Sequence, residues 1–161
     1  MNEIIIQKVN HLDTHKLILL VEESASEGFR HIKRLVNDYE TGANKFDKEG
    51  EALFIAYQNN EIVGVCGLNR DPYAKSKEVG RVRRLYISPR VRRLGIGRTL
   101  MDSVIAEARK NYKMLVLRTD NPIADVFYLS IGFSVKLDSE NDSHLLQLDE
   151  INNNRGGTIY A

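Results

Sequence analysis

Hydrophobic and polar positions alternate along the chain with two periods, one typical of strands and one typical of helices. Short runs rich in β-branched and apolar residues predict strands at 3–9, 52–58, 62–69, 78–87 and 114–119. Apolar positions three and four residues apart predict helices at 13–24, 29–42 and 95–111, and a short helix that runs into a further strand within 121–133. The segments 134–138 and 144–150 predict a closing hairpin around an acidic tip.

The order of these elements predicts an α+β fold, in which helices cover both faces of one mixed sheet. The strand–helix–strand unit at 78–119 predicts a parallel crossover. We find no internal repeat and no linker, so we expect a single domain over residues 1–150. The remaining segment, 151–161, has little to pack, and we expect it to be a mobile tail.

Composition narrows the class of protein without identifying it. The 161 residues are 42% apolar and 28% charged, as in an ordinary globular protein, and the net charge of +1 does not favour a general polyanion binder. A lone cysteine, Cys66, excludes an internal disulfide and suits a reducing cytoplasm. The chain has no signal-peptide pattern and no run of about 20 apolar residues, so we predict a cytoplasmic protein with no membrane partner.

Glycine and positive charge concentrate in SPRVRRLGIGRTLM (88–101), where the long helix is predicted to begin. Gly95 and Gly97 allow a ligand to approach the backbone, and the first helical turn offers unpaired N–H groups with partial positive charge. Arginines at 90, 92, 93 and 98 add charge, so the segment predicts a phosphate-bearing ligand. The P-loop and dinucleotide patterns both fail, because no lysine follows the glycines and Leu100 replaces a third glycine. A close helix–strand packing point with a solvated arginine rim is the alternative.

The chain resembles the GNAT superfamily of N-acetyltransferases in three motifs that occur in the order typical of that family. RRLYISP is similar to the strand end that precedes the family's coenzyme loop, and RRLGIG (92–97) meets its [QR]-x-x-G-x-[GA] pattern. NPIADVFYLSIGF (121–133) resembles its N-x-x-A-x-x-F-Y-x-x-x-G-F segment. By element order the resemblance extends over about residues 3–150.

The resemblance implies a mostly antiparallel, twisted sheet in which parallel strands four and five splay apart to admit acetyl-coenzyme A, with no metal. In the family, the pantetheine arm pairs with the backbone of the fourth strand, which here means Leu85, Tyr86 and Ile87. The diphosphate would rest on the backbone amides of Arg92, Arg93, Leu94, Gly95, Ile96, Gly97 and Arg98. Asn121 would contact the coenzyme, although its place before Pro122 is equally that of a turn former.

The resemblance also assigns chemistry at the thioester. A backbone N–H near Ile87 would stabilise the tetrahedral intermediate, and Tyr128 would serve the departing thiolate. Tyrosine has a pKa near 10 and a thiol about 8.5, so full proton transfer is uphill by roughly 2 kcal/mol, and we expect Tyr128 to act mainly as a hydrogen-bond donor. By spacing alone, Tyr128 belongs to the apolar stripe of a core helix.

The general base is the weakest part of the resemblance. An alkylamine has a pKa of about 10.4 and must be neutral to attack, so a base is expected. Many relatives carry glutamate where this chain has Arg81, and arginine does not act as a base. Glu78 is the nearest carboxylate on that strand, although it faces the other way unless a bulge intervenes. His31 and His144 are further candidates, and an N-terminal amine with a pKa of about 7.7 would need less help.

The arginines of the fourth strand raise a question of substrate class. Alternation places Arg81 and Arg83 on one face and Arg84 on the other. If the first two line the acceptor cleft, they would suit an acceptor that carries a carboxylate or phosphate. The alternative is that they pair with acidic side chains such as Glu78 or those of the first helices.

The sequence therefore predicts an N-acetyltransferase that uses acetyl-coenzyme A and a primary amine. Two alternatives remain open: a catalytically silent coenzyme A sensor with this fold, and a basic nucleic-acid-binding module. The near-zero net charge and the absence of an aromatic platform among the arginines disfavour the nucleic-acid module. The acceptor is not defined by the sequence, and a homodimer, common among relatives, leaves no mark in it.

Overall fold

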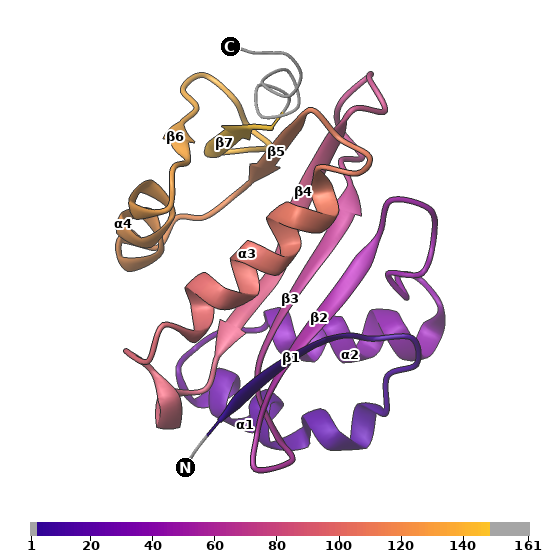
Figure 1. Cartoon of the computed structure of the whole chain (residues 1–161), viewed down its shortest axis with the longest axis vertical. Helices are drawn as coiled ribbons and strands as arrows, with labels where there is room; N and C mark the ends of the chain where they lie inside the picture. The colour runs from indigo at the N-terminus through magenta and orange to yellow at the C-terminus, as the bar shows by residue number, and fades with distance from the viewer. Residues whose placement is uncertain (1–2, 149–161) are drawn as a thin grey trace.

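A twisted sheet forms the centre of the computed structural model, which describes residues 3–148 (Figure 1). Among these residues the sheet has seven strands in the order β1-β2-β3-β4-β5-β7-β6. The strands are β1 (Ile4–Lys8), β2 (Ala52–Gln58), β3 (Glu61–Arg70), β4 (Val79–Ile87), β5 (Met114–Leu117), β6 (Ser134–Val135) and β7 (His144–Gln147). Neighbouring strands are antiparallel except β4 and β5, which are parallel.

Helices cover both faces of this sheet. They are η1 (Thr14–Leu17), α1 (Ile18–Ser26), α2 (His31–Thr41), η2 (Pro89–Val91), α3 (Ile96–Ala108) and α4 (Pro122–Ser130). In Figure 1, α3 crosses one face over β2–β4, α1 and α2 lie behind the sheet, and α4 stands beside β6. The α3 face buries one apolar core that includes Leu100 and Val104, and the other face buries a second that includes Ile32 and Leu35. Burial of these apolar side chains is the main force that holds the layers together.

The predicted α+β architecture and the parallel crossover are confirmed. The segment predicted as one helix at 13–24 is instead a 3-10 turn capped by Asp13, followed by α1. The long helix begins at Ile96 and ends at Ala108, inside its predicted range. The predicted tail at 151–161 lies outside the described residues, as does the end of the domain predicted at residue 150. In the described part of the chain, no helix is both long and apolar enough to cross a bilayer.

Candidate active site

The parallel strands β4 and β5 separate toward one end of the sheet. β4 pairs with β5 only at Val79–Arg81, opposite Met114–Val116. Beyond Arg81, β4 continues to Ile87 without a further β5 partner. This edge of β4 therefore offers backbone groups to an extended ligand, as the family resemblance implied.

Backbone groups of β4 face this opening at alternate residues. The Ser88 N–H donates to the Val63 carbonyl oxygen at 2.8 Å, so Ser88 and, two residues earlier, Tyr86 direct their backbone groups toward β3. Leu85 and Ile87 consequently turn theirs toward the opening. The predicted backbone contact of Tyr86 with the ligand stays a prediction, to which this alternation gives no support.

A β-bulge in β4 changes which side chains share a face. Cys66 of β3 lies opposite two β4 residues, Arg84 and Leu85, and Arg84 has a left-handed φ of 63°. The extra residue turns Arg84 to the same side as Arg83, where its Nη2 lies 3.4 Å from the Asp38 carboxylate of α2. The prediction that Arg84 faces away from the other two arginines of the strand is therefore wrong, because the bulge interrupts the alternation.

Arg81 is almost fully buried and is already paired. Its Nε donates to Oδ1 of Asp71 at 2.7 Å, and its guanidinium lies 5.0 Å from the centre of the Tyr73 ring. The side chains of Arg81 and Asp71 are only 6% and 5% exposed, and within residues 3–148 Arg81 Nη2 is buried without a hydrogen-bond partner. Arg81 thus pairs with an acid, as one of the two alternatives expected, but that acid is Asp71 rather than Glu78.

The start of α3 has the geometry of an anion site. Gly95 precedes the helix with a φ of 79°, and Arg93 also has a left-handed φ, of 70°. The first intrahelical bond runs from the Thr99 N–H to the Gly95 carbonyl oxygen at 3.1 Å. In the described residues, the N–H groups of Ile96, Gly97 and Arg98 have no backbone acceptor. Left-handed residues beside a helix start form a concave set of N–H groups that suits a phosphate.

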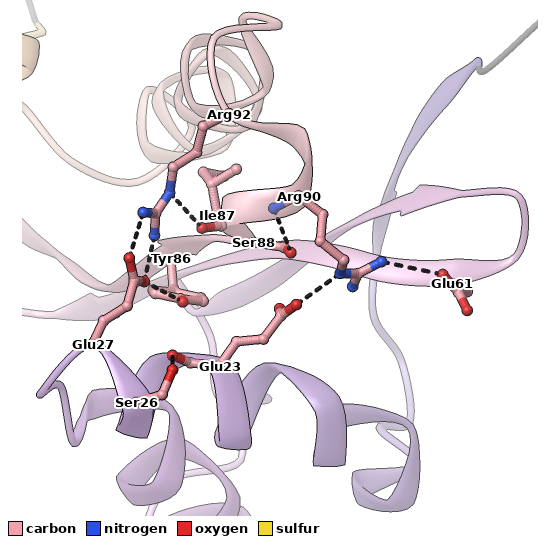
Figure 2. Close-up of polar contacts among 9 residues, drawn as sticks. All are labelled: Glu23, Ser26, Glu27, Glu61, Tyr86, Ile87, Ser88, Arg90 and Arg92. Carbon is pink, nitrogen blue, oxygen red and sulfur yellow. Dashed lines mark hydrogen bonds and ion pairs between the residues drawn. The ribbon is translucent and has the colours of Figure 1, made fainter.

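Two of the four arginines near this helix start are bound to acidic residues (Figure 2). Arg90 Nε lies 2.7 Å from Glu23 Oε2 of α1, and its Nη1 lies 3.3 Å from Glu61. Arg92 donates to the Glu27 carboxylate through Nη1 at 2.6 Å and Nη2 at 2.7 Å, and through Nε to the Ile87 carbonyl oxygen at 3.0 Å. These contacts offset much of the positive charge on which the nucleic-acid-binding alternative depended.

The remaining two arginines, Arg93 and Arg98, make no ion pair with any residue in 3–148. Both lie within the segment predicted to hold the diphosphate, as does Leu94, whose side chain is exposed. The positive charge available to an anion at this helix start therefore comes from these two side chains and from the helix dipole.

Tyr128 of α4 is buried in the core on the α3 face of the sheet. Its ring contacts those of Phe127 and Phe133, so it belongs to the core, as its spacing predicted. Burial, reinforced by the nearby Cys66 thiol, raises the pKa of the Tyr128 hydroxyl. Because Cys66 lies opposite the bulge, Tyr128 stands on the α3 side of the β4 bulge. The hydroxyl stays protonated at ordinary pH, so it is a hydrogen-bond donor and a weak acid.

Glu78 does not join the other predicted residues. It immediately precedes β4 at the closed end of the β4–β5 pair, where its carboxylate lies 3.4 Å from Lys113 Nζ and is 56% exposed. At about 3.3 Å per residue, the strand carries Glu78 roughly 20 Å from the bulge. The structure therefore gives no support to Glu78 as the base.

Asn121 caps the start of α4. Its Oδ1 accepts from the backbone N–H groups of Ile123 at 2.8 Å and Ala124 at 3.3 Å. The turn-forming role expected from its chemistry is confirmed, and the predicted contact with a coenzyme stays a prediction.

The two candidate histidines differ in how their ring nitrogens are used. His144 has Nε2 at 2.6 Å from Asp125 Oδ1 and Nδ1 at 2.7 Å from Ser143 Oγ, so both nitrogens are occupied. His31 interacts with the backbone of Leu85, while its buried Nε2 has no hydrogen-bond partner. Burial, followed by the nearby Arg84 charge, lowers the pKa of His31 below 6.5, which keeps the ring neutral at pH 7.

Sequence reasoning did not find Glu27 or Asp71. Glu27 meets Arg92 across 65 positions of sequence, and Asp71 reaches Arg81 from the adjacent loop. Neither residue belongs to a motif. A cue for the second pair was present, since an arginine in an otherwise apolar strand needs a nearby acid.

The comparisons with known proteins agree with this geometry. The sequence model of the Acetyltransferase (GNAT) family matches residues 17–133, so the chain belongs to this family. A putative acetyltransferase from Exiguobacterium sp. 255-15 is 28% identical, with a TM-score of 0.83 over 93% of this chain and 97% of that one. No curated protein sequence matches the chain.

Two further solved structures share the fold. A GNAT-family acetyltransferase from Staphylococcus aureus Mu50 is 24% identical, with a TM-score of 0.72 over 91% of this chain and 99% of that one. The PaiA N-acetyltransferase from Thermoplasma acidophilum, solved in complex with coenzyme A, is 20% identical, with a TM-score of 0.66 over 90% and 99%. Within residues 3–148 we find no cluster of side chains that could hold a metal ion.

Proposed function

We propose that the protein is an N-acetyltransferase that transfers the acetyl group of acetyl-coenzyme A to a primary amine. One observation carries the proposal: β4 and β5 part beyond Arg81, and the free edge of β4 leads to the unpaired amides at the start of α3. A ligand with an extended amide arm and a diphosphate fits both features. Coenzyme A has both, and a relative of the same fold is solved with it.

The residues at the helix start have room for such a group. A Cβ added to Gly95 would meet no atom within 4 Å, so the space in front of this residue is open. A Cβ on Gly97 would lie 3.4 Å from the Phe127 ring, which leaves contact distance but no space to spare. We propose that the amides of residues 92–98, chiefly those of Ile96, Gly97 and Arg98, hold the diphosphate. Leu85 and Ile87 would pair with the amide arm, and Asn121 would lie beside it.

We assign the proton transfers to two side chains. As nitrogen forms its bond to the acetyl carbon and the carbon–sulfur bond breaks, the amine must lose a proton and the sulfur must be stabilised. His31 has an unpartnered Nε2 and a depressed pKa, which suits a general base. Tyr128 is a protonated donor on the other side of β4 and would hydrogen-bond to the departing sulfur. The Ile87 N–H faces the opening and is the candidate oxyanion donor.

A thiol-release assay with a panel of primary amines tests this function. Acetyl-coenzyme A with a suitable amine should give free thiol and N-acetylated product in equal amounts, and Tyr128→Phe should reduce the rate by about 10- to 1,000-fold. The matched control within α4 is Val126→Ala, which should keep the wild-type rate because Val126 is 67% exposed.

A different pattern would favour the silent sensor. Acetyl-coenzyme A would then raise the melting temperature of the protein without thiol release on any amine. The replacement of the family's usual glutamate by the paired Arg81 is the observation that keeps this second function under test. A cytoplasmic location and a homodimer stay predictions.

A further inference from the structure

Arg83 differs from the other arginines of β4 in having no acidic partner. Arg81 is paired with Asp71, and Arg84 with Asp38. Among residues 3–148, Arg83 makes no ion pair, and its Nε is buried without a hydrogen-bond partner. A buried donor without a partner is costly, so this guanidinium is a ready site for an anionic group.

The Arg83 side chain lines a cleft of about 500 Å³ on the α2 side of the sheet. The cleft lies between the end of α2, the connector that follows it and the edge of β3 and β4. Its charged lining residues are Lys45, Lys48, Arg70 and Arg83, which are basic, and Asp38, Asp47 and Glu51, which are acidic. Four of these side chains are basic and three are acidic, and one of the acids, Asp38, is already paired with Arg84, so the lining keeps a net positive charge that suits an anionic group.

Arg83 also stands close to the proposed reaction centre. It immediately precedes the bulge, two residues before Leu85, whose backbone faces the opening. Two residues of strand span about 7 Å, which an arginine side chain and a short amino acid can bridge. An anion held by Arg83 would therefore lie within a few bonds of an amine at the opening.

We propose that Arg83 binds a carboxylate carried by the acceptor, so that the substrates are amines with a carboxylate close to the amino group. This inference rests on the proposed acetyl transfer. Carboxylate oxygens match the planar fork of a guanidinium and would satisfy the buried Nε. An amine without the carboxylate leaves that donor unpaired, which is how a polar site discriminates against an analogue.

Matched acceptors test the inference. Each amino acid is compared with its own primary amide, which keeps the amine and side chain and removes the charge. For the wild-type protein we expect kcat/KM to favour the acid by about 10- to 100-fold, the value of one charge-assisted hydrogen-bonded contact. Arg83→Gln should bring the acid-to-amide ratio close to one, and Arg83→Lys should restore part of it.

Arg109→Gln is the matched control, because Arg109 also has a buried Nε without a partner but lies at the end of α3. It should keep the wild-type ratio. A wild-type protein that acetylates amides as fast as acids, or prefers an aminoalkyl phosphate, overturns the inference while leaving acetyl transfer intact. If no amine gives thiol release, the proposed function fails. Calorimetry with coenzyme A present then tests the carboxylate site by itself: if the site exists, an amino acid must bind the wild type more tightly than it binds Arg83→Gln.

Discussion

Glu27, the residue directly after α1, links the end of that helix to the end of β4 and to the segment before α3 (Figure 2). Its carboxylate accepts two hydrogen bonds from Arg92, at 2.6 and 2.7 Å, and one from the Tyr86 hydroxyl at 2.5 Å. The change Glu27→Gln keeps the size of the side chain and removes its charge. We expect this variant to be less stable than the wild type, because one neutral amide cannot replace the carboxylate in all three hydrogen bonds.

The size of the expected loss of stability follows from how exposed the Arg92–Glu27 pair is. The Arg92 and Glu27 side chains are 41% and 28% exposed, so water screens them and the contribution is far below that of a buried pair. Three charge-assisted hydrogen bonds of this kind should give about 2 kcal/mol, which lowers the melting temperature of a chain of this size by roughly 4–8 °C. Thermal or urea unfolding at pH 7 measures it. The control is Glu61→Gln, because Glu61 is 63% exposed and makes one 3.3 Å contact to Arg90.

The pH dependence of the stability difference between the wild type and Glu27→Gln provides a second test. Hydrogen bonds from Arg92 and Tyr86 hold the pKa of Glu27 below its ordinary value. A carboxyl group with a lower pKa in the folded state than in the unfolded state, where it is about 4.3, stabilises the folded protein at higher pH. This stabilisation is lost as the pH falls through the pKa of the folded state. The wild type and Glu27→Gln should therefore converge in acid. A difference that persists unchanged into acid, or an equal loss in Glu61→Gln, would refute the reasoning.

Three further predictions concern the candidate site. His31→Gln should lower kcat/KM by about 10²- to 10⁴-fold and remove the rise of rate with pH that we expect in the wild type as His31 loses its proton, at a pH below the ordinary pKa of histidine, and added imidazole should restore part of the rate. Gly97→Leu should raise the KM for acetyl-coenzyme A by more than about 10-fold, whereas Gly97→Ala should bind nearly as well, because a Cβ there meets Phe127 only at contact distance. Arg81→Met should cost about 3–5 kcal/mol in urea unfolding, because it leaves Asp71 buried and unpaired, and Arg81→Met with Asp71→Leu should recover much of that loss.

Local patterns predicted most of the fold. The apolar run 52–58 predicted a strand, and this strand is buried for most of its length, as an apolar run without alternation favours. Gly42 follows α2 and Gly95 precedes α3, each with a left-handed φ, and both lie at the ends of the predicted helices 29–42 and 95–111. These features succeed because strand periodicity and helix termini depend on residues close in sequence.

The parts of the site that the sequence did not predict depend on ion pairs between residues that lie far apart in the sequence. The contact of Glu27 with Arg92 joins α1 to the segment before α3, and no spacing rule relates the two. The same applies to Arg90, whose charge is shared by Glu23 and Glu61 from two different elements. The basic character of 88–101 was therefore overestimated from the sequence, because acids that arrive from elsewhere in the fold are invisible in a local count of charge.

The bulge in β4 shows how one residue links stability to the candidate site. Without it, strict alternation would turn Arg84 toward the α3 side, into the apolar core that holds Val82 and Leu85. The left-handed φ of Arg84 costs about 1 kcal/mol or more but keeps this charge on the α2 side, where it meets Asp38. Asp38 is then already paired when Arg83 reaches the same cleft. The insertion that keeps a charge out of the core therefore also leaves Arg83 available to an acceptor.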